Sequence, residues 1–136
     1  MDTTKQTILT IEDNAPLARA LNRKLEDEGY AVLSAADGQA GLDLALEAKP
    51  DLILLDVMMP VMDGKEMLAR LRRDTWGSTV PVILLSNDDN PETINETVNR
   101  TGGKMLTEMN DYLIKSDISL EQIVEAVRAK LAPKNA

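Results

Sequence analysis

The sequence contains neither cysteine nor histidine, and these two absences remove whole classes of chemistry. Without cysteine, the chain has no disulfide, no thiol nucleophile and no cysteine-type zinc site. Without histidine, it has no imidazole base, no histidine metal ligand and no phosphohistidine of its own. Any chemistry must therefore come from carboxylates, hydroxyls, lysine or backbone groups.

Aromatic side chains are also scarce, since the chain has one Trp, two Tyr and no Phe. Hydrophobic residues make up 43% of the chain, and they must therefore build an aliphatic core. The length of 136 residues is close to the commonest size of one domain. A net charge of −8 argues against direct binding of nucleic acid, which needs Lys and Arg on the phosphates. No apolar run reaches the roughly 18 residues of a membrane span, and the N-terminus lacks the plan of a signal peptide. We expect a single cytoplasmic domain over residues 1–136, with a core at about 7–131 and no contact with membrane or nucleic acid.

Short apolar runs alternate with longer amphipathic stretches along the chain. The apolar runs predict five strands, at Thr7–Ile11, Ala31–Ala36, Leu52–Leu55, Val80–Leu85 and Asp111–Lys115. Start signals predict the helices between and after them, including Pro16, the Asp63–Glu66 and Ser119–Gln122 spacings, and Asn90-Pro91. Asp37-Gly38 predicts a turn before the second helix. This alternation predicts an α/β fold, in which a doubly wound five-stranded parallel sheet, (βα)5, lies between two helix layers as α/β/α.

Polar side chains follow four of the predicted strands, at the edge where such sheets bind ligands. They are Glu12 and Asp13 after the first strand, Asp56 after the third, Ser86 after the fourth and Lys115 at the end of the fifth. Three carboxylates brought together repel one another unless a cation is present, and Mg²⁺ is a hard ion that takes oxygen ligands. A hydroxyl and an ammonium opposite the metal would face the anion that the metal holds. This combination predicts a phosphoryl-transfer site.

The same residues carry a resemblance to a known family. The chain resembles the CheY-like receiver domain of bacterial two-component response regulators at four places. These are the acidic pair, the DVMMPVMDG segment that begins at Asp56, the hydroxyl after strand four and the lysine of strand five. The resemblance covers about residues 7–131 and implies a flavodoxin-like fold, with one receiver domain over 1–136 and no output domain.

The resemblance also implies a role for each matching residue. Asp56 would be the phosphoacceptor, and Ser86 and Lys115 would contact the phosphoryl oxygens. The implied Mg²⁺ ligands are Glu12, Asp13, Asp56 and the backbone carbonyl of Met58. The implied switch residues are Ser86 and Tyr112, and Asn87 and Asp88 would flank the phosphoryl site.

The implied partners follow from the same likeness. A histidine kinase or a histidine phosphotransfer protein would donate the phosphoryl group in a phosphorelay. The chain would be a signalling domain that assists its own phosphorylation and dephosphorylation, and not an enzyme. A downstream protein target would bind the face formed by helix four, strand five and helix five, and this face could also hold a homodimer together.

The sequence departs from the family pattern at three places. Ser116 follows Lys115 where the family usually has proline, and Asn87 stands where a small residue is usual. The stretch between Ser86 and Lys115 is also longer than expected, with the excess near Thr101–Asn110. These departures keep open an alternative, a pseudo-receiver that binds proteins independently of phosphorylation. Affinity for magnesium separates the two hypotheses.

Overall fold

The computed structural model describes residues 5–57, 59, 61–86, 110–115 and 118–131, and for 110–112 and 114 the backbone alone. Five strands form one parallel sheet, namely β1 (Thr7–Ile11), β2 (Ala31–Ala35), β3 (Leu52–Asp56), β4 (Val82–Ser86) and β5 (Asn110–Ile114). The described helices are α1 (Ala15–Asp27), α2 (Gly38–Ala48), α3 (Gly64–Arg73) and α6 (Leu120–Leu131). The strand order is β2-β1-β3-β4-β5, which confirms the doubly wound α/β fold.

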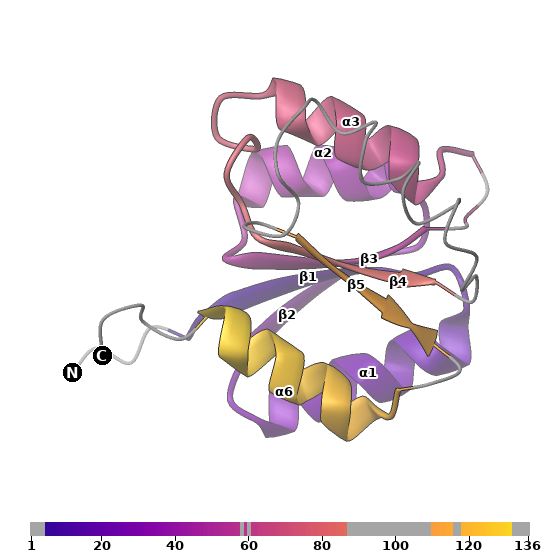
Figure 1. Cartoon of the computed structure of the whole chain (residues 1–136), viewed down its shortest axis with the longest axis vertical. Coiled ribbons are helices and arrows are strands. Elements are labelled where there is room, and N and C mark those ends of the chain that lie inside the picture. Colours follow the sequence, from indigo (N-terminus) through magenta and orange to yellow (C-terminus); the bar gives the residue numbers. More distant parts are fainter. Residues whose placement is uncertain (1–4, 58, 60, 87–109, 116–117, 132–136) are drawn as a thin grey trace.

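The sheet is the middle of three layers (Figure 1). Helices α2 and α3 cover one face, while α1 and α6 cover the other. Successive side chains of a strand point to opposite faces, so the central strands feed both cores. In β3, for example, Ile53 and Leu55 pack in the cluster below α2 and α3, whereas Leu52 and Leu54 pack with residues of α1 and α6. The aliphatic core expected from the composition is therefore divided between the two faces of the sheet.

Side chains placed just before the helices fix where these helices begin. Asn14, Asp37 and Asp63 each accept a hydrogen bond from the backbone N–H three residues later. The expected capping box of α6 is confirmed in both directions, since Ser119 and Gln122 exchange hydrogen bonds at 2.8 and 3.1 Å. The prediction of a separate turn at Asp37-Gly38 is wrong, because Asp37 caps α2 and Gly38 is already its first residue.

The boundaries of four strands differ slightly from the sequence expectation. β2 ends at Ala35 and not at Ala36, and β3 extends to Asp56. β4 begins at Val82 and not at Val80, because Pro81 has no N–H to donate to a ladder. β5 begins at Asn110 and ends at Ile114, so Lys115 directly follows the strand. The helix expected from Asn90-Pro91 lies outside the described residues, as does most of the Thr101–Asn110 stretch. None of the described helices is long and apolar enough to cross a membrane.

Because all five strands are parallel, their carboxyl ends lie at one edge of the sheet. Ile11 of β1 pairs with Leu55 of β3, so Glu12 and Asp56 are next along their strands. Asp56 pairs in turn with Leu85 of β4. Ligands of open α/β sheets bind at this edge, and the edge therefore positions the candidate site.

Candidate functional site

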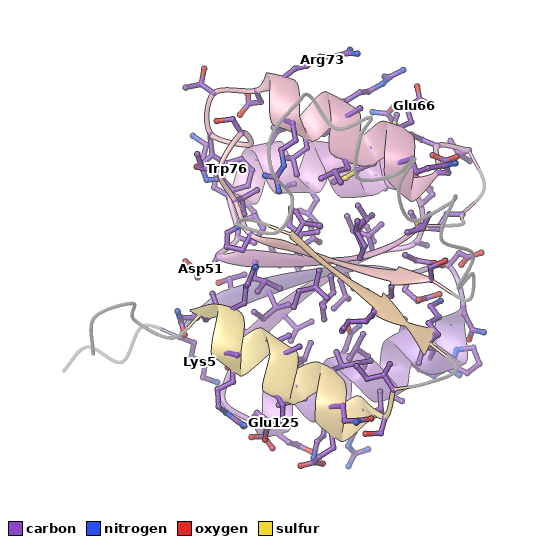
Figure 2. All side chains as sticks on the ribbon, in the orientation of Figure 1. Lys5, Asp51, Glu66, Arg73, Trp76 and Glu125 are labelled. Atoms are coloured by element: carbon purple, nitrogen blue, oxygen red, sulfur yellow. The ribbon has the colours of Figure 1, made fainter. Side chains whose placement is uncertain are left out.

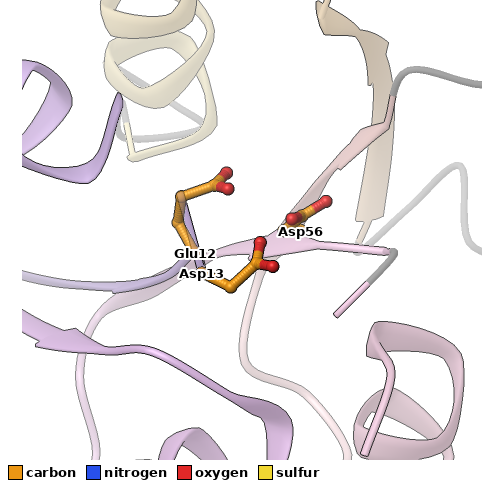
Figure 3. A group of neighbouring side chains, drawn as sticks. All are labelled: Glu12, Asp13 and Asp56. Atoms are coloured by element: carbon orange, nitrogen blue, oxygen red, sulfur yellow. The ribbon is translucent and has the colours of Figure 1, made fainter. Parts of the chain in front are cut away.

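Three carboxylates meet at this edge of the sheet. Glu12 and Asp13 directly follow β1, and Asp56 is the last residue of β3 (Figure 3). One carboxylate oxygen from each of the three lies within 4.8 Å of the other two. Glu12 and Asp56 are only 3% and 4% exposed, whereas Asp13 is exposed. The expected clustering of these acidic residues is therefore present, with two members buried and one open to solvent.

Lys115 supplies a positive charge to this cluster. Its ammonium Nζ lies 2.8 Å from Glu12 Oε1 and 3.4 Å from Asp56 Oδ2, and its side chain is 15% exposed. The other oxygen of Glu12, Oε2, accepts a hydrogen bond of 3.1 Å from the backbone N–H of Asn14. Glu12 is thus oriented from two sides, and Lys115 bridges the ends of the β1 and β3 strands.

The donor set fits a hard divalent cation. Within the part of the chain that the structure describes, the cluster places three carboxylates beside the ammonium of Lys115, and the excess of carboxylates favours a further cation. Apart from its ion pair, the buried Glu12 Oε1 has no hydrogen-bond partner among the described residues. Carboxylate oxygens of this kind are the ligands that Mg²⁺ takes in proteins. The expected fourth ligand, the carbonyl of Met58, lies outside the described residues.

The remaining expected site residues differ in how far the structure places them. Ser86 ends β4, is fully buried, and stands one residue beyond Leu85, the register partner of Asp56. Tyr112 lies within β5, where the backbone alone is described. The two residues expected to flank the phosphoryl group, Asn87 and Asp88, lie outside the described residues.

One structural element of the site was missed by the sequence reasoning. The backbone of Gly64, at the start of α3, packs directly on Asp56, since an added Cβ would lie 2.4 Å from the Asp56 carbonyl oxygen. Its N–H also donates a 2.8 Å hydrogen bond to the carbonyl of Val57. The glycine after Asp63 was the available signal, because a backbone that approaches another this closely requires glycine.

Comparison with known proteins agrees with this geometry. Residues 8–128 match the family model of the response regulator receiver domain. The chain is 40% identical over 128 residues to the transcriptional regulatory protein YkoG of Bacillus subtilis, covering 93% of this chain and 51% of YkoG. It is 34% identical over 131 residues to the DNA-binding response regulator MtrA of Mycobacterium tuberculosis, covering 96% of this chain and 53% of MtrA. The chain thus spans about half the length of these curated relatives.

Among solved structures, the chemotaxis protein CheY4 of Vibrio cholerae superposes with a TM-score of 0.82 at 26% identity, over 94% of this chain and 100% of CheY4. MtrA is named as DNA-binding, so the expectation of no nucleic-acid partner has no support for a longer protein of this kind. Receiver domains are signalling domains that act with histidine kinases, and the partner class expected from the sequence is that of the family. The chain therefore belongs to the response regulator receiver domain family of two-component systems, with its flavodoxin-like fold.

Proposed function

We propose that this domain, with its core at about residues 7–131, accepts a phosphoryl group on Asp56 in a magnesium-dependent step of a phosphorelay. The donor would be the phosphohistidine of a histidine kinase or a phosphotransfer protein, because this chain has no histidine. One observation carries the proposal. The Asp56 carboxylate stands at a strand end with the Lys115 ammonium 3.4 Å away and two further carboxylate oxygens within 4.8 Å.

The chemistry follows from the charges at this strand end. A carboxylate oxygen of Asp56 attacks phosphorus, and the bond from phosphorus to the donor's imidazole nitrogen breaks as the new P–O bond forms. The Lys115 ammonium, already beside Asp56, offers its positive charge to a phosphoryl oxygen. The hydroxyl of Ser86, on the neighbouring strand β4, donates a hydrogen bond to a second phosphoryl oxygen.

Glu12, Asp13, Asp56 and the Met58 carbonyl are the residues that would hold magnesium. When bound, the ion supplies positive charge that offsets the negative charge of the phosphoryl oxygens. Asp13 is exposed at the mouth of the site, whereas Glu12 is buried and already oriented by Asn14. The chain's own residues therefore prepare the ligand set before the donor arrives.

Phosphorylation would then act as a switch. An aspartyl phosphate places about −1.5 to −2 charges at the end of β3, and these attract Lys115 and the Ser86 hydroxyl. Both residues stand at the ends of β4 and β5, so their movement carries the following segments with them. Phosphorylation would thereby shift the balance between two conformations of the domain and alter the face that includes β5 and α6. We propose that a downstream protein target, and any homodimer partner, binds this face.

The intact mass of the protein after incubation with acetyl phosphate tests the proposal. We expect one phosphoryl adduct in the presence of magnesium and none without it. Asp56→Asn should abolish the adduct because the amide is a poor nucleophile. Asp51→Asn is the matched control, since Asp51 is exposed beside the opposite end of the same strand (Figure 2), and it should keep the adduct.

The contrary outcomes are also informative. An adduct that survives in Asp56→Asn would place the acceptor elsewhere. If wild type forms no adduct and also fails to bind beryllofluoride, the phosphorylation-independent pseudo-receiver becomes the better account.

A further inference from the structure

The first turn of α2 touches the loop that connects β3 to α3. A Cβ added to Gly38 would lie 2.1 Å from the carbonyl oxygen of Met62 and 2.9 Å from its carbonyl carbon. Real Cβ atoms do not approach other atoms so closely. Because the atoms met belong to the backbone, no rotation of a side chain relieves the clash, and one of the two segments must move.

This loop is the one that leaves the candidate phosphoacceptor. It starts after Asp56 and is closed at its far end by the hydrogen bond from the Gly64 N–H to the Val57 carbonyl. Between these ends, the side chain of Met62 is 5% exposed and is buried in the core cluster below α2 and α3. Met62 therefore anchors the loop twice near its far end, by its side chain in the core and by its carbonyl against Gly38.

Helix α2 is the firmer of the two segments. Its first turn is fixed by the Asp37 cap at 2.8 Å, and Gly41 packs closely on Ile11 of the central strand β1. In the loop, Val61 has a φ of 70°, which a β-branched residue rarely adopts, and its side chain is 83% exposed. A side chain at position 38 should therefore displace the loop and leave α2 in place.

We propose that Gly38 is a positioning residue of the phosphoryl site. It lets Met62 rest on α2 and so fixes the end of the loop just before Gly64, whose backbone packs on the carbonyl of Asp56. Gly38 itself touches neither metal nor phosphoryl group. The inference rests on the proposed function, because the loop matters to chemistry only if Asp56 is the acceptor.

Gly38→Ala tests this inference, with Gly41→Ala as the matched control. Alanine favours a helix more than glycine does, so a purely helical role for Gly38 would leave magnesium binding unchanged. We expect Gly38→Ala to weaken magnesium affinity in a calorimetric titration and to slow phosphorylation by acetyl phosphate about tenfold or more. Gly41→Ala adds the same methyl group to the same helix, but the atoms that it meets belong to the side chain of Ile11 and not to the loop. It should bind magnesium and react within about twofold of wild type.

A second pair of variants tests the loop side of the contact, should Gly38→Ala fail to fold. Met62→Ala removes the core anchor of the loop, whereas Leu42→Ala removes a similar volume from the same core cluster on α2. We expect weaker magnesium binding in the first and unchanged binding in the second, with both variants folded by circular dichroism.

The outcomes distinguish failure of the positioning role of Gly38 from failure of the proposed function. Wild-type magnesium affinity and wild-type rate in folded Gly38→Ala, or in folded Met62→Ala, would overturn the positioning role while leaving the proposed function intact. Failure of wild type both to form the adduct and to bind beryllofluoride would overturn the proposed function, and this inference with it.

Discussion

At the scale of residues, the ion pairs of Lys115 set the charge balance of the candidate site. The ammonium contacts two buried carboxylates, Glu12 and Asp56, at 2.8 and 3.4 Å. Removing one partner of a buried ion pair leaves an uncompensated charge, which usually costs more than the pair itself contributes.

Replacement of Lys115 by methionine should therefore destabilise the metal-free protein by about 3 kcal/mol. Added magnesium should restore part of this loss, because a bound cation takes over the role of the missing ammonium. Urea denaturation with and without magnesium measures both effects. Lys5→Met, at an exposed residue, is the control and should change little. Equal unfolding free energies for Lys115→Met and wild type without magnesium would contradict the expectation.

The sequence predicts which residues form the site better than it predicts how they pair. The apolar runs end at Ile11, Leu55 and Leu85, so the pattern of the chain alone assigns the polar residues that follow to strand ends. The contact of Lys115 with Glu12 was not predicted, because it depends on how two side chains pack between strands. The approach of Gly38 to Met62 was missed for the same reason, since no pattern along the chain reports it.

At the scale of elements, ionic contacts connect α1 and α6 on their outer surface. Lys24 lies 2.8 Å from Glu121, and Arg128 lies 2.6 Å from Glu28. A hydrogen bond from Lys24, together with its charge, holds the pKa of the Glu121 carboxyl below its ordinary value of 4.5. Since the folded-state pKa is the lower one, this pair stabilises the fold above pH 4.5 and loses its effect as the carboxyl becomes protonated on acidification.

Glu121→Gln should therefore lower the melting temperature slightly at neutral pH and have no effect once the pH is well below 4.5. The effect should be small and should decrease in high salt, because the pair is exposed to solvent. Thermal unfolding of wild type and variant at both pH values measures this difference. A difference that persisted in acid would assign the loss to packing and not to charge.

The element boundaries show which local signals are dependable. Asp63 and Ser119 were expected to start helices and do so, because a cap is a local hydrogen bond between near neighbours in the chain. The cap that Asn14 provides for α1 was not predicted. Asp37 was assigned to a turn, although its side chain makes the same kind of cap. Aspartate followed by glycine fits both structures, so this pair of residues does not by itself distinguish a turn from the start of a helix.

At the scale of the whole molecule, the sequence pattern predicts a parallel sheet but does not specify the order of its strands. Alternation of strands with helices predicts a parallel sheet with right-handed crossovers, and the observed order β2-β1-β3-β4-β5 follows this rule. The sheet pairs segments far apart in the sequence, such as Ser86 with Ile114, and periodicity alone carries no such information. The resemblance to receiver domains was needed to assign strand neighbours.

The whole molecule should also respond to magnesium as a ligand of the folded state. With a net charge of −8 and three converging carboxylates, the folded chain offers a site that the unfolded chain lacks. A ligand at about 100 times its dissociation constant stabilises by about 2.7 kcal/mol, so the melting temperature should rise with magnesium.

Asp13→Asn should reduce this rise, because Asp13 is the exposed carboxylate of the cluster. Sodium chloride at matched ionic strength is the control for general screening and should not reproduce the rise. An equal rise in wild type and Asp13→Asn would contradict a site that includes Asp13.

The ammonium of Lys115 also affects how the protein depends on magnesium in a cell. It gives Glu12 and Asp56 a counter-ion that belongs to the chain itself. These two buried carboxylates therefore do not depend on a bound metal for a counter-ion. Under the proposed function, the concentration of free magnesium would then set the fraction of molecules able to accept a phosphoryl group, while the number of folded molecules would stay nearly constant.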